Sequence, residues 1–132
     1  MTFLERLHDE VLIGDGAIGT MLYAKGVSLD ANVEHLNLVR PSLVLELHRE
    51  YLAAGARVIE TNTFGANWTR LAAIGLEKKE REINLRGAQL AREAAQGTDA
   101  FVAGSVGPLV RMKGDERELS ACTKRSPLIT RT

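Results

Sequence analysis

At 132 residues, the chain is long enough for one domain with a buried core and too short for several. Seventeen basic residues balance seventeen acidic ones, so neither nucleic acid nor an anionic membrane surface is an expected partner, and no apolar stretch approaches the roughly 18–20 residues of a membrane span. The single cysteine excludes an intrachain disulfide, and the first residues lack the apolar run of a signal peptide, which favours a cytoplasmic protein.

The first third of the chain predicts a helix, a short strand and a second helix. Apolar residues at helical spacing predict a leading helix over residues 3–11. The apolar run at 11–13 stops at glycine-rich residues, which is typical of a buried strand. Pro41 suits a first helical position and Gly55 a helix end, so a second helix is expected between them. Its inward positions are Leu43, Leu47, Tyr51 and Ala54.

The same alternation continues along the chain. Short apolar runs at 56–59 and 100–103 predict two further strands. Between them, apolar spacing predicts a helix from about residue 77 to 96, ended by Gly97, with the charged residues at 77–82 facing solvent. Strands that alternate with helices in this order predict an α/β fold with a parallel sheet.

Unusual polar and glycine-rich segments follow all three predicted strands. They lie at residues 14–20, 60–65 and 104–108. In parallel α/β folds, ligands bind at the carboxyl ends of the strands, where the loops gather. The sequence therefore predicts a binding site at this rim of the sheet.

The first of these segments also fits a dinucleotide-binding pattern, with Gly14, Gly16 and Gly19 spaced as G-x-G-x-x-G. That fold expects a second strand ending in an acidic residue about 20 positions later, whereas the next credible strand here ends at Glu60. Asp15 would also face the pyrophosphate and repel it. A small dinucleotide-binding domain remains the weaker alternative.

Asp15 suits an amino-acid head group better. A carboxylate flanked by glycines can accept hydrogen bonds from an ammonium group, while small neighbours let backbone N–H groups approach a carboxylate. The competing interpretation is that Asp15 only caps the following turn. The residues alone leave both open.

Together, three segments resemble the homocysteine S-methyltransferase family. They are the strand and loop at 11–22, the segment Glu60-Thr61-Asn62-Thr63-Phe64-Gly65 and the segment Gly104-Ser105-Val106-Gly107-Pro108. The intervening Glu34-His35-Leu36-Asn37 and Pro41 fit as well. Within the family, the chain looks closest to the bacterial bifunctional form that is fused to methylenetetrahydrofolate reductase.

The resemblance implies a (β/α)8 TIM barrel, of which this chain would hold about the first three βα units. It implies that Asp15 binds the amino group of homocysteine and that the N–H groups of Gly16 and Ala17 bind its carboxylate. The other implied pocket residues are Thr61, Thr63 and Phe64, with Phe64 as an apolar wall. Glu60 and Asn62 could instead tie strands together.

The family transfers a methyl group to a thiol, which zinc activates by deprotonation. The resemblance implies three cysteine ligands from later strands; Cys122 matches no such position, and the three histidines lie on predicted helices or a connecting loop. The chain alone is therefore expected to lack a zinc site and to be inactive. The implied methyl donor is methyltetrahydrofolate or S-methylmethionine.

The composition changes near residue 120. We therefore divide the chain into residues 1–120, the N-terminal part of a homocysteine-binding barrel, and an irregular, non-native tail at 121–132 that would follow a frameshift or premature stop. Exposed sheet edges would favour self-association or a complementing chain. A second hypothesis is a non-catalytic module that keeps the amino-acid pocket without zinc.

Overall fold

The computed structural model describes residues 1–109. The predicted boundary at residue 120, the tail at 121–132 and Cys122 lie outside the described residues. Within the described part, the order of elements is α1 (Phe3–Asp9), α2 (Gly19–Ala24), α3 (Leu36–Val39), α4 (Pro41–Ala53), β1 (Val58–Glu60), α5 (Trp68–Ala72), the 3-10 helix η1 (Glu77–Lys79), α6 (Glu80–Ala95) and β2 (Phe101–Ala103). No helix among residues 1–109 is both long and apolar enough to cross a bilayer.

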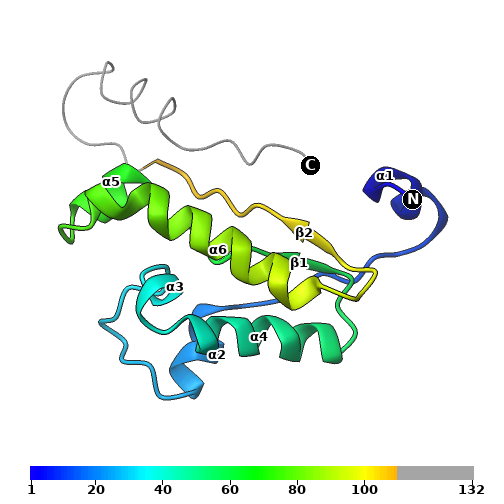
Figure 1. The fold of residues 1–132 in the computed structure, drawn as a ribbon, viewed down its shortest axis with the longest axis horizontal. Helices are drawn as coiled ribbons and strands as arrows, with labels where there is room; N and C mark the ends of the chain where they lie inside the picture. The colour runs from blue at the N-terminus through cyan, green and yellow to red at the C-terminus, as the bar shows by residue number, and fades with distance from the viewer. Residues whose placement is uncertain (110–132) are drawn as a thin grey trace.

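The two strands form a parallel sheet, as the sequence predicts. Val58 pairs with Phe101 and Glu60 with Ala103, and the connection between the strands runs through α5, η1 and α6. Helices α4 and α6 pack against each other along the sheet, α4 contacting β1 and α6 contacting β2 (Figure 1). The mixed α/β class is therefore confirmed.

The predicted first strand at residues 11–13 is wrong as a regular strand. The segment joins the sheet through a single parallel bridge between Gly14 and Val58. Its hydrogen bonds run from Arg57 N and Val58 N to Ile13 O, at 2.7 and 3.1 Å, and from Asp15 N to Val58 O at 2.9 Å. The segment therefore runs parallel to β1 but contributes one bridge in place of a regular ladder.

Helix α4 begins and ends where Pro41 and Gly55 predict. Pro41 occupies the first turn, and Gly55 adopts a φ of +107°, a conformation that favours glycine. The predicted inward face is confirmed at Leu47, which is buried, while Leu43 and Tyr51 pack partly buried against the same core. Ala54 is exposed, and α4 also buries Val44 and His48. Helix α4 packs against both β1 and α6, and its buried face is turned toward these two elements.

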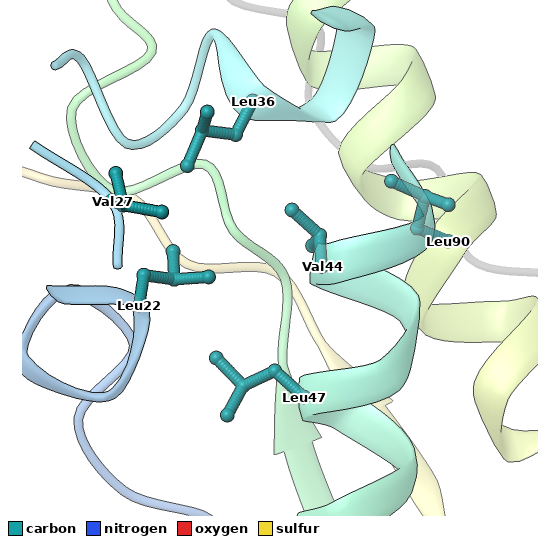
Figure 2. Close-up of a cluster of buried hydrophobic side chains, with 6 residues drawn as sticks. All are labelled: Leu22, Val27, Leu36, Val44, Leu47 and Leu90. Carbon is teal, nitrogen blue, oxygen red and sulfur yellow. The ribbon is translucent and has the colours of Figure 1, made fainter. Parts of the chain in front are cut away.

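One apolar cluster joins four helices. Figure 2 shows its six buried members: Leu22 from α2, Leu36 from α3, Val44 and Leu47 from α4, Leu90 from α6, and Val27. A second cluster seats β1 on the helices through Ile59, Ala91 and Ala94. These contacts fix β1, and hence the residues that follow it, relative to α4 and α6.

Helix α6 approaches the segment after β1 closely because of Gly87. A Cβ at this position would lie 2.7 Å from both Asn37 Nδ2 and Thr63 Cγ2. The predicted solvated charge run also needs one correction, since Glu80 at the start of α6 is buried. The first turn of α6 lies next to Ala66, because Asn84 donates to both Ala66 O and Glu80 O.

We expect Gly87→Ala to destabilise the protein, although alanine in a helix interior normally gains about 1 kcal/mol over glycine. The added methyl group would overlap Asn37 and Thr63, and overpacking of this kind costs about 1–3 kcal/mol. Urea denaturation measures the change. Gly19→Ala, whose Cβ would meet nothing closer than 3.9 Å, is the control; equal or higher stability of both variants would contradict the expectation.

Helix α1 lies at the amino end of the sheet, away from α5 (Figure 1). A capping box between Thr2 and Glu5 starts it. Its Phe3 ring meets the Phe101 ring edge-on with 5.3 Å between centroids, and Arg6 forms an ion pair with Asp99 at 3.2 Å. The opposite, carboxyl ends of the strands are free of this helix.

Candidate functional site

Asp15 lies at the carboxyl end of β1. Its Oδ2 accepts a hydrogen bond from the N–H of Glu60, the last residue of β1, at 2.9 Å. Its own N–H donates to Val58 O at 2.9 Å. The glycine-rich segment therefore places the Asp15 carboxylate at the carboxyl end of β1. We call residues 14–17, 60–65 and 104–107 the rim.

Partial burial raises the pKa of the Asp15 carboxyl group above its ordinary value. The negative charge of Glu60 raises this pKa further, while the hydrogen bond from the Glu60 N–H opposes both effects. Removal from water disfavours the charged carboxylate, and a cation beside it would restore that form. Asp15 thus has the electrostatic properties of a group that gains from an ammonium partner.

Gly16 and Ala17 are exposed beside Asp15. Among residues 1–109, no group accepts a hydrogen bond from either N–H. The carbonyl of Ala17 instead accepts from the Tyr51 hydroxyl at 2.7 Å. A Cβ on Gly16 would lie 3.1 Å from the same Tyr51 hydroxyl oxygen. The Tyr51 hydroxyl of α4 therefore holds this segment through Ala17 O. The N–H groups of Gly16 and Ala17 are left next to the Asp15 carboxylate.

Thr61 and Thr63 are buried and bonded to the segment after β2. Ser105 N donates to Thr61 Oγ1 at 3.0 Å, and Thr63 Oγ1 donates to Ser105 O at 2.8 Å. The two hydroxyl oxygens are 2.6 Å apart. Because Thr63 uses its only hydrogen on Ser105 O, Thr61 must donate to Thr63. The three residues form a closed ring that joins two rim segments.

Phe64 points outward from the same rim. Half of its surface is exposed, and the Arg70 guanidinium lies 5.7 Å from its ring centroid, within cation–π range. The backbone of Phe64 is fixed by Gly107, whose N–H donates to Phe64 O at 3.0 Å. A side chain on Gly107 would overlap that carbonyl, so glycine is required for this close approach.

The structure thus brings the six predicted residues to one end of the sheet through a chain of contacts. Asp15 contacts Glu60, and Glu60 Oε2 accepts from Ser105 Oγ at 2.9 Å. Sequence reasoning missed Tyr51, Arg70 and the side chain of Ser105 at this rim. A hydroxyl at a core position of α4 was the one signal that could have indicated Tyr51. The sequence around the exposed Arg70 and the half-buried Ser105 carries no such signal.

The described part of the chain offers no ready metal site. Within residues 1–109, no three histidine, cysteine, aspartate or glutamate side chains are grouped so that they could hold a metal ion. A structural or catalytic zinc ion needs three or four convergent protein ligands. The residues described here therefore do not fit zinc.

Comparison with known proteins gives a consistent set of relatives. Residues 12–126 match the family model described as homocysteine S-methyltransferase. The methionine synthase of Mycobacterium leprae is 38% identical over 116 residues, which is 80% of this chain and 10% of that protein. The methionine synthase of Mycobacterium tuberculosis is 36% identical over the same shares. The chain thus spans about a tenth of the length of these relatives.

Solved structures give the same result. The homocysteine methyltransferase MmuM from Escherichia coli, in its metallated form, superposes with a TM-score of 0.67 at 31% identity, covering 77% of this chain and 40% of that one. Its oxidised form superposes with a TM-score of 0.69 at 32% identity, covering 80% and 40%.

Proposed function

Because the chain belongs to the homocysteine S-methyltransferase family, we propose that it forms part of the homocysteine-binding pocket of a methyltransferase that produces methionine. The observation that carries this proposal is the arrangement at Asp15. A carboxyl group with a raised pKa lies directly beside the N–H groups of Gly16 and Ala17, which have no acceptor within residues 1–109. One end of this arrangement suits an ammonium group and the other a carboxylate, as in an α-amino acid.

The roles of the rim residues follow from their contacts. Asp15 would accept from the amino group of homocysteine, and Gly16 and Ala17 would donate to its carboxylate. The half-exposed ring of Phe64 would pack against the aliphatic chain. Thr61 and Thr63 are bonded to Ser105, so we assign them to shaping the pocket wall rather than to direct binding through their donors.

Methyl transfer requires the homocysteine thiol to lose its proton so that sulfur can attack the methyl group. In the family, zinc supplies this activation, but residues 1–109 do not assemble a ligand set for it. The residues at 1–109 therefore have the roles of binding and orienting the substrate. Methyltetrahydrofolate and S-methylmethionine remain the proposed donors.

The resemblance in fold supports a wider proposal, that the described unit is part of a (β/α)8 barrel in a cytoplasmic protein. Helices α4 and α6 bury Ile59 on one side of the sheet. On the segment that runs beside β1, Val11 and Ile13 are exposed by 90% and 62%. An apolar edge of this kind favours association with a second copy or a complementing chain, which sedimentation at several concentrations would detect.

Calorimetric titration of the purified chain with homocysteine and, separately, with NAD tests the proposed binding. We expect saturable binding of homocysteine and none of NAD. Homocysteine lacking its amino group should bind more weakly, because Asp15 would lose its cationic partner. Saturable binding of NAD without binding of homocysteine would favour the dinucleotide alternative and contradict the proposal.

A further inference from the structure

The segment Val33 to Asn37 lies beside the rim residues 62–65 and is joined to them by four hydrogen bonds. Asn62 Nδ2 donates to Val33 O and to Asn37 Oδ1, both at 2.9 Å. Asn37 Nδ2 donates back to Asn62 O at 2.8 Å. Glu34 Oε1 accepts from Gly65 N at 2.7 Å. We call residues 33–37 the clamp; it includes a motif that the binding roles above leave unused.

The two asparagine side chains are buried, and each uses both of its amide hydrogens. Asn37 is 0% and Asn62 3% exposed. Asn37 uses its second amide hydrogen on Ile83 O of α6, at 3.2 Å. A buried amide is costly unless its donors and acceptors are paired. The reciprocal pairing therefore holds the backbone of Asn62 in one position between α3 and α6.

This position determines where the neighbouring side chains point. The Asn62 side chain reaches α3, whereas the hydroxyls of Thr61 and Thr63 on either side of it both reach Ser105. The backbone turns tightly at Asn62, where Thr63 N donates to Thr61 O at 2.9 Å. The anchored Asn62 thus turns Thr61 and Thr63 toward the segment after β2, where they close the ring that shapes the rim.

Glu34 holds the other end of the rim segment, just after Phe64. A Cβ on Gly65 would lie 2.6 Å from Glu34 Oε1, so the carboxylate occupies the space that any other residue would need. A hydrogen bond to a charged acceptor is stronger than one between neutral groups. The Glu34 carboxylate therefore fixes the backbone on which Phe64 is displayed.

We propose that Glu34 and Asn37 are positioning residues for the homocysteine pocket, holding residues 61–65 in the conformation that binds the substrate. They act through the rim backbone and do not touch the ligand. This role in substrate binding rests on the proposed function. Whether Glu34 and Asn37 hold the rim backbone can be tested without a ligand.

Hydrogen exchange and ¹H–¹⁵N NMR of the full chain test the structural part with Glu34→Ala and Glu34→Gln. In Glu34→Ala, the amides of Gly65 and Gly107 should lose protection while those of α4 and α6 keep theirs. Glu34→Gln keeps an oxygen that can accept from Gly65 N and should restore most of that protection. Uniform loss of protection, or no loss at the rim, would overturn the inference.

Two further variants sharpen the comparison. Gly65→Ala displaces the Glu34 carboxylate without altering its charge and should reproduce the Glu34→Ala signature. Glu46→Ala removes an exposed carboxylate of α4, which pairs with Lys25, and should leave the rim amides unchanged. Equal rim effects of Glu46→Ala and Glu34→Ala would count against the inference.

Homocysteine affinity tests the functional part. Glu34→Ala should weaken binding roughly tenfold, because a hydrogen bond to a charged group contributes on this order, with recovery in Glu34→Gln. Unchanged affinity together with an altered rim would contradict the positioning role. If the unaltered chain binds no homocysteine, the proposed function fails, while the exchange pattern still decides whether the clamp fixes the rim.

Discussion

Asp15→Asn should weaken homocysteine binding about 10- to 100-fold with little change in the fold, because it removes a charge-assisted hydrogen bond contributing about 1.5–3 kcal/mol. The amide oxygen can still accept from Glu60 N, the contact that fixes this side chain in the structure. Isothermal titration measures the affinity, and circular dichroism checks the fold.

The pKa of Asp15 adds a pH dependence to the same experiment. Because burial and Glu60 raise this pKa, the carboxylate becomes protonated at a higher pH than an ordinary aspartate. Affinity for the ammonium group should therefore be full above the raised pKa and fall as the pH drops through it. In Asp15→Asn this fall should be absent.

Asp99→Asn is the matched control for Asp15→Asn. Asp99 lies at the amino end of the sheet, where it pairs with Arg6 and Arg57. The same chemical change at that end should leave homocysteine affinity unaltered. If the two variants lost equal affinity, or if Asp15→Asn bound as well as the unaltered chain, Asp15 would not be the ammonium partner.

Acid should destabilise the protein through His48, and His48→Leu should remove about 3 kcal/mol of that loss. Burial lowers the pKa of His48 to about 4, from 6.5. Within residues 1–109, neither ring nitrogen has a hydrogen-bond partner. The unfolded chain therefore binds a proton at a pH where the folded chain does not, so stability is full above pH 6.5 and falls as the pH drops toward 4.

Urea denaturation at pH 7.5 and at pH 4.5 measures this effect, read as the difference between the His48→Leu variant and the unaltered chain. Leucine fills a similar volume without a titrating group. His8, whose side chain is 89% exposed in α1, is the control position, and His8→Gln should retain the acid sensitivity. Parallel pH profiles for His48→Leu and the unaltered chain would show that His48 does not couple to folding.

Much of the architecture could be predicted because a few residues mark element boundaries unambiguously. Pro41 and Gly55 bound α4. Gly97, at a φ of +78°, follows α6. Apolar spacing correctly predicted the helix itself, since η1 and α6 together span residues 77–95. The apolar run at residues 11–13 did not become a regular buried strand: it makes a single bridge to β1, and Val11 and Ile13 are exposed.

The site was predictable in its placement but not in its bonding. Parallel strands bring their carboxyl ends together, which placed Asp15 near the end of β1 without any knowledge of its partner. The Thr61–Thr63–Ser105 ring and the bond from Gly65 to Glu34 depend on tertiary contacts between residues far apart in the chain. Burial of Glu80 and His48 likewise follows from how α4 and α6 dock.

We propose that the rim at the carboxyl ends of the strands binds the head group of homocysteine. A homocysteine titration of the ¹⁵N-labelled chain, followed by NMR, tests it most directly. We expect saturable shifts of the Gly16 and Ala17 amides and of residues 61–64, with α1 unaffected. Shifts confined to α1 and the amino end of β2, or no saturable shift at the rim, would contradict it.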